Sequence, residues 1–347
     1  MRAAVFREFG GQVAVETVED PGCPSDGVVV AVRANGVCRS DWHAWMGHDP
    51  DVSLPHVPGH ELAGVVAETG SDCRDWQVGD RVTVPFVTAC GHCPECRNGQ
   101  HQICQQSEQP GFSTWGAFAD YVAIHHADTN LVGLPEGIGF TAAASLGCRF
   151  TTAFRAAIER GRLGAGEWLA VHGCGGVGLS AVMIGVAAGA NVVAVDINPQ
   201  ALAQAHALGA ATTVDGRALA DVPAAIADAT RGGAQVSIDA LGDTATCRNS
   251  ILCLAPQGRH VQAGLLEGEH ADPRLPMGAV IGRELEILGT HGMAAHRFPR
   301  MLDMTTNGRL APERLIGRRI TLDDAPAALT GLAEKRDPGV TVIEFGA

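Results

Sequence analysis

The sequence predicts an α/β protein in which a β-rich part is joined to a six-stranded doubly wound sheet. Residues 1–150 consist of short β-branched runs broken by Gly, Pro and Asp, which is typical of strands with long loops. From about residue 151 to residue 290, helix-length stretches alternate with single buried strands, as in a parallel sheet covered on both faces. A glycine-rich turn at residues 173–178 follows the first of these strands.

Strands of the first part are expected in the runs that follow Gly27, Glu61 and Asp80, and no helix of clear 3.6-residue periodicity precedes residue 140. The tail from about residue 291 returns to polar turns and ends in a strand at 339–345. Strands of the second part are expected near 168–172, 191–196, 211–214, 236–240, 258–263 and 285–289.

Length and charge restrict the kind of protein. A chain of 347 residues exceeds what one hydrophobic core usually supports, so two domains are expected. A net charge of -13 disfavours nucleic acid and anionic membranes as partners. We see no apolar run long enough to span a bilayer and no signal-peptide core, so we expect a cytoplasmic protein with reduced thiols.

Four cysteines lie close together, separated by two, two and seven residues: Cys90, Cys93, Cys96 and Cys104. In a reducing compartment this spacing indicates one tetrahedral zinc ion held by four thiolates rather than disulfides. Because four protein ligands leave no vacant position, this zinc is expected to be structural.

The glycine-rich turn has the pattern Gly-x-Gly-x-x-Gly between a strand and a helix, with the residues Gly173, Gly175, Gly176, Val177 and Gly178. The first glycine permits a tight turn, the second lets the backbone approach a pyrophosphate, and the third allows close helix packing. The helix N-terminus offers amide groups to the phosphates. This context predicts a dinucleotide-binding domain.

Eighteen residues after the last of these glycines, Asp196 ends the second predicted strand. A carboxylate there accepts hydrogen bonds from the ribose hydroxyls of NAD and repels the additional phosphate of NADP. The alternative is an aspartate that only caps a turn. We expect NAD(H), since the following residues 197–199 contain no arginine to bind a 2'-phosphate.

Further motifs resemble those of the zinc-containing medium-chain alcohol dehydrogenases along essentially the whole chain. The matching pieces are Gly59-His60-Glu61, then Gly64, Gly70 and Cys73, and then residues 78–82. The resemblance implies a GroES-like catalytic domain at 1–150, completed by 291–347, and a Rossmann domain at 151–290.

The resemblance also implies a second, catalytic zinc bound by Cys38, His60 and Cys148, with one exchangeable position. Taken singly, His60 could be a histidine of the core, and Cys148 could be a residue that only packs in the core. Asp41 resembles the family carboxylate that orients the liganding imidazole. Glu61 is expected either to approach the metal during ligand exchange or to lie behind the ligands.

In the family, a bound alcohol loses its proton through a relay, and the resemblance assigns that relay to Ser40, a cofactor ribose hydroxyl and His43. The alternative for His43 is an ordinary surface position. Arg39 matches a residue that reaches the pyrophosphate, or is a surface charge. Thr152 matches a position that packs on the nicotinamide ring.

The chain departs from the family pattern at the pyrophosphate and ribose. Val340 follows Gly339 where an arginine is frequent, and Ala201 stands where a lysine often touches the adenosine ribose. These departures leave the affinity for the cofactor open. For Arg149, beside the third proposed zinc ligand, the sequence suggests no role.

By family position, Trp45, Phe86 and Trp115 are candidate walls of a substrate pocket, and all three are bulky and apolar. They favour an apolar or aromatic primary or secondary alcohol, interconverted with its aldehyde or ketone. A tryptophan on a loop is also often simple packing. The alternatives are a polyol dehydrogenase of the same superfamily and a catalytically silent zinc-binding relative. The resemblance implies a homotetramer, or a dimer, that pairs the strand at 285–289 across a two-fold axis.

Overall fold

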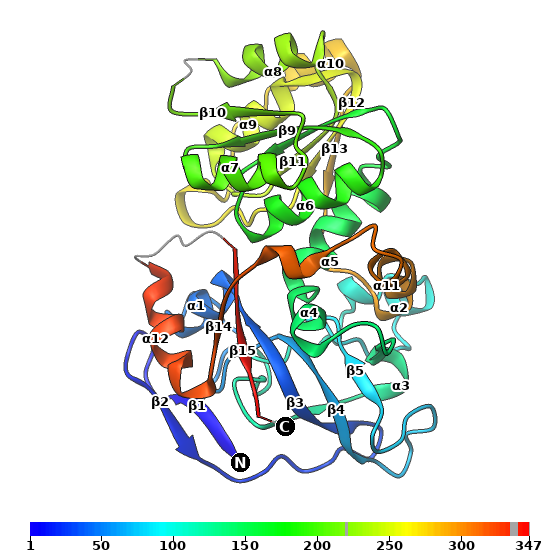
Figure 1. Cartoon of the computed structure of the whole chain (residues 1–347), viewed down its shortest axis with the longest axis vertical. Coiled ribbons are helices and arrows are strands. Elements are labelled where there is room, and N and C mark those ends of the chain that lie inside the picture. Colours follow the sequence, from blue (N-terminus) through cyan, green and yellow to red (C-terminus); the bar gives the residue numbers. More distant parts are fainter. Residues whose placement is uncertain (219–220, 334–338, 347) are drawn as a thin grey trace. The chain divides into compact units, whose positions relative to one another are not determined.

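The structure, a computed structural model, describes residues 1–218, 221–333 and 339–346. It contains two compact units, Met1–Thr151 with Gly292–Ala347, and Thr152–His291. The predicted α/β class is confirmed, because one unit is rich in antiparallel strands and the other contains a six-stranded sheet. Both chain termini belong to the first unit (Figure 1). Within the described ranges, no helix is both long and apolar enough to cross a bilayer.

The first unit is built on a seven-stranded sheet, in which the described strands follow the order β14-β15-β3-β4-β5-β7 and β6 also pairs with β3. The long strand β3 pairs with β4, β6 and β15. The register of β15 sets Val342 opposite Gly36, so the last strand of the chain pairs with β3. The strands of this unit are β1 (Arg2–Phe6), β2 (Val13–Thr17), β3 (Val28–Val37), β4 (Glu61–Thr69), β5 (Arg81–Thr83), β6 (Tyr121–Ile124), β7 (Val132–Gly133), β14 (Ile316–Ile320) and β15 (Val340–Glu344).

Short helices connect these strands, and none of those before residue 140 is long enough to show the clear 3.6-residue periodicity that the sequence lacks there. Three α-helices lie before that point, and each has at most seven residues. Such lengths hold two turns or fewer, which is too few for a 3.6-residue period to be visible in the sequence. The helices are α1 (Arg39–Trp45), α2 (Pro94–Arg97), α3 (Ala127–Asn130), α4 (Phe140–Ser145), α5 (Cys148–Phe154, which runs into the second unit), α11 (Phe298–Thr306) and α12 (Ala325–Thr330).

The second unit is a parallel sheet with the strand order β10-β9-β8-β11-β12-β13. The order reverses between β8 and β11, which makes this the switch point where doubly wound sheets bind ligands. The predicted strands all form, although β12 starts four residues earlier than expected. The strands are β8 (Trp168–His172), β9 (Asn191–Asp196), β10 (Thr212–Asp215), β11 (Ala234–Asp239), β12 (Leu254–Gln262) and β13 (Glu286–Gly289).

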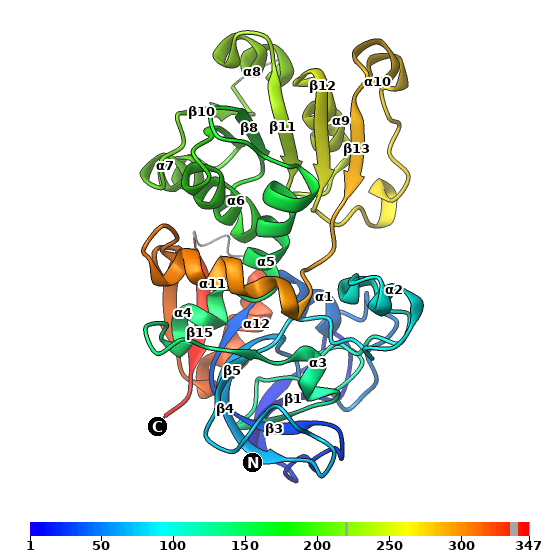
Figure 2. The ribbon, with the colours of Figure 1, turned by 90° about the vertical axis from the view of Figure 1, so that its right-hand side faces the viewer.

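Helices cover this sheet on both faces (Figure 2). Helices α6 and α7 pack on β8, β9 and β10, whereas α9 and α10 pack on β11 and β12. Side-chain oxygens cap several helices; for example, Asp243 accepts a hydrogen bond from the amide of Thr246. The helices of this unit are α6 (Gly176–Ala187), α7 (Pro199–Ala207), α8 (Val222–Thr230), α9 (Thr244–Leu252) and α10 (Met277–Arg283), and a π-helical turn (Arg155–Arg160) precedes β8.

Candidate metal and cofactor sites

The four clustered cysteines converge in the first unit. The Sγ atom of Cys93 lies 3.4 Å from that of Cys96 and 3.7 Å from that of Cys104, and the Sγ atoms of Cys104 and Cys90 are 3.5 Å apart. Thiolates bound tetrahedrally to zinc, with Zn–S bonds of about 2.3 Å, lie ~3.8 Å from one another. The cluster therefore fits one zinc ion, with its fourfold coordination complete.

A buried asparagine holds the start of this loop. Asn130 on α3 accepts a hydrogen bond from the amide of Ala89 at 2.7 Å and donates one to the carbonyl of Ala89 at 2.9 Å. Asn130 is 1% exposed, so its amide group needs partners in the protein, and Nδ2 also donates to the carbonyls of His125 and His126 at 3.2 Å. Asn130 does not stand out in the sequence, because it lies far from the cysteines along the chain and asparagine is common in loops.

A second set of ligand atoms gathers from three separate segments. Cys38 precedes α1, His60 precedes β4, and Cys148 begins α5. Their ligand atoms, with a carboxylate oxygen of Glu61, all lie within 4.8 Å of one another. His60 and Glu61 are completely buried. Two thiols, an imidazole and an adjacent carboxylate are a donor set that suits zinc.

Helix α1 positions the groups behind these ligands. The carboxylate of Asp41 accepts a hydrogen bond from the amide of Cys38 at 2.8 Å and another from the amide of Gly59 at 3.1 Å. The same carboxylate lies 2.8 Å from Nδ1 of His60. When Nδ1–H donates to the carboxylate in this way, Nε2 is the unprotonated nitrogen, and its lone pair is available to bind a metal. Asp41 thus connects the Cys38 and His60 segments.

The two thiols of this group differ in their tendency to ionise, since the hydrogen bond with Cys38, together with burial, raises the pKa of Cys148 well above its ordinary value. A hydrogen bond with Cys148 lowers the pKa of Cys38 well below its ordinary value, and the positive charge of Arg149 acts in the same direction against the effect of burial. Since the thiolate is the form of cysteine that binds metal, Cys38 is prepared to act as a ligand.

The predicted relay residues lie on the same helix. Ser40 has its hydroxyl 3.1 Å from Sγ of Cys38 and 3.3 Å from Nε2 of His60, so it is next to two ligand atoms. His43 is almost one turn further along α1, and its Nδ1 contacts Nδ1 of His48. The sequence did not point to His48.

Of the three predicted pocket walls, Phe86 lies near the ligand group, with its ring centroid 6.2 Å from that of His60. Phe112, which the sequence did not identify, is closer, at 5.2 Å. Trp45 is buried in a hydrophobic core and donates its indole N–H to the carbonyl of Gly11. Trp115 donates its indole N–H to the carbonyl of Pro55 and is 38% exposed.

The glycine-rich turn of the second unit joins β8 to α6. Gly173 has a φ of +87°, which favours glycine, and a side chain at Gly178 would meet the carbonyl of Gly173 at 1.7 Å. A Cβ at Gly175 meets nothing within 4 Å. The turn therefore packs closely on its strand side and leaves open space at its middle glycine, directly before the N-terminus of α6. This is the geometry that a pyrophosphate needs. Gly176 and Val177 form the first turn of α6.

Asp196 ends β9 beside this turn. One of its carboxylate oxygens accepts a hydrogen bond from the amide of Cys174 at 2.6 Å, and the other from the amide of Asn198 at 2.7 Å. The turn-capping contacts are thus present, and they fix the carboxylate at the edge of the glycine-rich turn. Capping and ribose binding are compatible, because each carboxylate oxygen has more than one acceptor direction.

Of the two other predicted cofactor contacts, Arg39 has partners within its own unit. The guanidinium of Arg39 donates to the carbonyl of Leu332 at 3.0 Å and lies 4.8 Å from the ring centroid of Trp42. Thr152 is buried in α5 at the start of the second unit.

Two family models match the chain. The model described as "Alcohol dehydrogenase GroES-like domain" matches residues 24–136, and "Zinc-binding dehydrogenase" matches residues 176–307. An alcohol dehydrogenase from Rhizobium meliloti is 35% identical over 93% of this chain and 98% of its own length. The chain belongs to the zinc-dependent medium-chain alcohol dehydrogenase family.

Other members of this family are similar over different lengths. An alcohol dehydrogenase from Geobacillus stearothermophilus is 39% identical, but the match spans only 62% of this chain and 64% of that protein. One from a Moraxella species is 37% identical and is likewise covered over 64% of its length. A geraniol dehydrogenase from Castellaniella defragrans is 33% identical over 91% of each chain.

Solved structures of the family have the same fold. An alcohol dehydrogenase from Thermus sp. ATN1 superposes with a TM-score of 0.91 at 30% identity, covering 99% of both chains. A putative zinc-binding dehydrogenase from Sinorhizobium meliloti, solved with NADP, superposes with a TM-score of 0.88 at 28% identity, also covering 99% of both.

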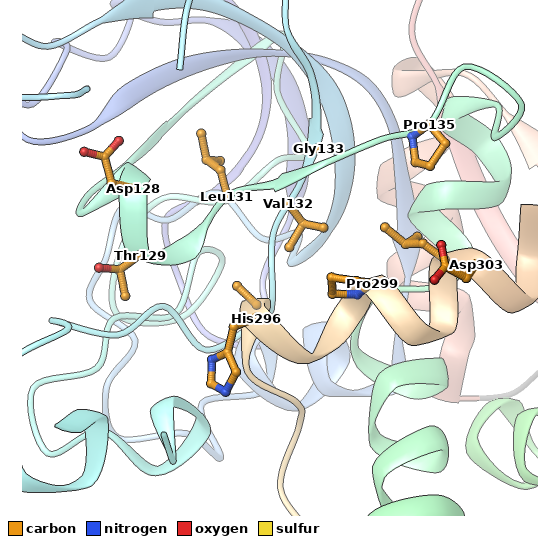
Figure 3. Close-up of a pocket in the computed structure, with 11 residues that line it drawn as sticks. Asp128, Thr129, Leu131, Val132, Gly133, Pro135, His296, Pro299 and Asp303 are labelled. Atoms are coloured by element: carbon orange, nitrogen blue, oxygen red, sulfur yellow. The ribbon is translucent and has the colours of Figure 1, made fainter. Parts of the chain in front are cut away.

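A surface pocket of about 370 Å³ lies elsewhere in the first unit. Figure 3 shows Asp128 and Thr129 of α3, together with Pro299 and Asp303 of α11, on its lining. None of the lining residues belongs to either cysteine-containing group or to the glycine-rich turn. The pocket is therefore separate from the chemistry described above.

Proposed function

We propose that this protein is an NAD-dependent zinc alcohol dehydrogenase, which interconverts an apolar or aromatic alcohol with its aldehyde or ketone. One observation carries the proposal: the set of Cys38, His60 and Cys148, with the Asp41 carboxylate behind the imidazole. Three protein ligands with an oriented histidine are the arrangement of a catalytic zinc site, whereas the four-cysteine cluster has the arrangement of a structural one.

When bound, zinc lowers the pKa of an alcohol hydroxyl, and the nicotinamide ring of NAD accepts a hydride. The protein supplies the other requirements. Asp41 fixes the tautomer of His60, and Ser40 lies beside the ligand atoms, where its hydroxyl is the first acceptor for the alcohol proton. His43 then passes the proton outward, since an imidazole changes its charge near neutral pH.

NAD rather than NADP is proposed because Asp196 places a carboxylate at the glycine-rich turn. A 2'-phosphate next to that carboxylate would be repelled, and residues 197–199 contain no arginine to neutralise it. The structure from Sinorhizobium meliloti contains NADP, but that protein is only a relative of this chain. Measuring the activity of the present protein with NAD and with NADP tests which cofactor it uses.

The apolar substrate class is supported by two phenylalanine rings. Phe86 and Phe112 both lie beside His60, and an apolar wall favours a hydrophobic alcohol over a polyol, whose hydroxyls need polar partners. The similarity to a geraniol dehydrogenase agrees with this class. Polyol oxidation is the alternative, and the activity assay described next tests both substrate classes.

The test is nicotinamide absorbance after NAD or NADP is mixed with primary, secondary, benzylic, terpenoid and polyol alcohols. We expect NADH formation with apolar alcohols and its loss after chelation of the metal. NADH formation with polyols alone would overturn the substrate class. No reduction of either cofactor by a protein that retains its zinc would favour the catalytically silent alternative.

We also propose a homotetramer, in which the edge strand β13 pairs across a two-fold axis. Ile281 and Ile287, on α10 and β13, are 75% and 38% exposed. An edge strand next to exposed apolar side chains is a surface that a partner covers. One chain has a mass of 36.0 kDa, and light scattering should give four times that value. A dimer would mean that the β13 contact is the whole assembly, and a monomer would contradict the proposed contact.

A further inference from the structure

We propose that Arg149 is a positioning residue that holds the carboxylate of Glu61 away from the catalytic metal, so that the fourth coordination position stays free for substrate. This inference rests on the proposed function. It addresses a residue for which the sequence suggests no role, although Arg149 directly follows the proposed ligand Cys148.

The contacts between these two residues use both oxygens of the carboxylate. The backbone amide and Nε of Arg149 donate to Oε1 of Glu61 at 3.1 and 3.0 Å, while Nη2 pairs with Oε2. The remaining guanidinium nitrogen, Nη1, donates to the carbonyl of Val37 at 3.1 Å. A fork of this kind binds a carboxylate in a fixed orientation, which a lysine cannot do.

These contacts join the three segments that carry the metal ligands. Val37 precedes Cys38, Glu61 follows His60, and Arg149 follows Cys148. Arg149 thus sets the position of each ligand segment with respect to the other two, across separations of 88 and 112 residues.

Two glycines provide the space for the pair. A Cβ at Gly36 would lie 2.3 Å from Oε2 of Glu61 and 3.0 Å from Nη2 of Arg149. A Cβ at Gly147 would lie 2.7 Å from Cβ of Glu61. Any side chain at either position would displace the carboxylate, so the carboxylate is held by packing as well as by charge.

Charge explains why the pair matters for the metal. A carboxylate oxygen of Glu61 is already within 4.8 Å of every other ligand atom in the group, and Glu61 is completely buried. A buried carboxylate without a partner is unstable. If Arg149 is removed, the metal is the nearest cation, and Glu61 becomes a fourth protein ligand that competes with substrate.

The test uses the protein loaded with Co²⁺, whose visible absorption reports the ligands of the ion, and imidazole as a small neutral ligand for the free position. In the wild type, we expect imidazole to change the spectrum. In Arg149→Gln, we expect the imidazole dissociation constant to rise about tenfold, which corresponds to Glu61 occupying the position in about nine molecules of ten. The double variant R149Q/E61Q should restore binding near the wild-type value.

Gly36→Ala provides a second route to the same displacement and keeps the Arg149 charge, should R149Q fail to fold. Its matched control is Gly133→Ala on β7, where a Cβ meets only ordinary contacts at 3.7 and 3.8 Å. We expect weaker imidazole binding in G36A and no change in G133A. Unchanged imidazole binding in R149Q, or in G36A if R149Q does not fold, would overturn the proposal.

The spectra need neither NAD nor an alcohol, so they separate this inference from the proposed activity. A wild-type protein that binds imidazole at Co²⁺ but reduces no nicotinamide would contradict the proposed reaction and leave the role of Arg149 intact. A merely structural ion pair would lower the thermal stability of R149Q without changing the response to imidazole.

Discussion

The Nδ1 atoms of His43 and His48 lie 3.0 Å apart. In a contact of this length between two ring nitrogens, one ring donates its N–H and the other accepts it. His43 is on α1, the helix that also carries Ser40 and Asp41. The proposed path from Ser40 to His43 therefore continues to a second imidazole.

The first prediction concerns this path. Replacing His43 by Ala should slow NADH formation at least tenfold below pH 7, because the base that takes the proton outward is lost. Small buffer bases should partly restore the rate. Steady-state rates between pH 5.5 and 8, with and without added imidazole, provide the measurement. His206→Ala, at an exposed position on α7, is the control; equal rates for the two variants would remove His43 from the reaction.

The second prediction concerns the support of His60 by Asp41. Asp41→Asn weakens the acceptor at Nδ1, and a supporting residue of this kind typically contributes 10- to 100-fold to metal affinity. We expect zinc to leave D41N faster in a chelator competition assay, with one ion per chain affected and the other retained. Asp51→Asn on the exposed loop after α1 should release zinc at the wild-type rate. A wild-type rate in D41N would contradict the role of Asp41.

The third prediction concerns the cysteine cluster. Native protein should contain two zinc ions per chain, and Cys96→Ser should contain one, because three thiolates bind zinc less tightly than four. The loss should destabilise the first unit by several kcal/mol, since metal binding contributes folding free energy at a structural site. Elemental analysis and calorimetry measure both effects. Cys23→Ser, outside both metal groups, should change neither; a single zinc in the wild type would contradict the two-site assignment.

The fourth prediction concerns the choice of cofactor. Asp196→Ala should raise KM for NAD about tenfold or more and lower the NAD to NADP ratio of kcat/KM, since the repulsion of a 2'-phosphate disappears. The neighbouring strand offers a matched control, because Asp215 pairs in register with Asp196. Asp215→Ala should leave the ratio unchanged. An unaltered ratio in D196A would assign Asp196 only to capping the turn.

The fifth prediction concerns stability in acid. Burial lowers the pKa of His172 to about 3 and that of His260 to about 4, from an ordinary value of 6.5. Below pH 6.5 the unfolded chain binds protons that the folded chain does not, so stability falls as the pH falls toward 4. Each histidine contributes a loss of about 1.4 kcal/mol per pH unit in that range.

The variant that tests the fifth prediction is His260→Gln, and His206→Gln at an exposed position is the control. Calorimetric melting temperatures between pH 7 and pH 4.5 should fall less steeply for H260Q than for H206Q. Comparing the two variants removes the contribution of acid-induced zinc loss, which they share. Parallel curves would show that His260 carries a proton in the folded protein.

The features that could be predicted from the sequence are local ones. The cysteine cluster and the glycine-rich turn each occupy fewer than twenty consecutive residues, so their spacing directly reflects their geometry. Most strands of the second unit were predictable because they are apolar runs between a helix and a turn, and the central ones are buried. The helices α1, α2 and α3 were missed, since each is too short to show a period.

The Cys38, His60 and Cys148 group could be named in advance only through the family resemblance, because no local pattern connects residues so far apart. Phe112, His48 and Asn130 were not identified, although they contact His60, His43 and the start of the cysteine cluster. Their residue types are ordinary in loops, and their partners are distant along the chain or on another element.

The sequence by itself determined the class of fold, the four-cysteine cluster and the glycine-rich turn, because each depends on residue type at short spacing, and it indicated the family through motifs along the whole chain. Only the tertiary structure showed that Arg149 and Glu61 form a buried pair between the ligand segments, and that Asp41 joins two of those segments. Such contacts arise when strands and helices from distant parts of the chain pack together. Packing, rather than spacing, decides which buried charges become partners.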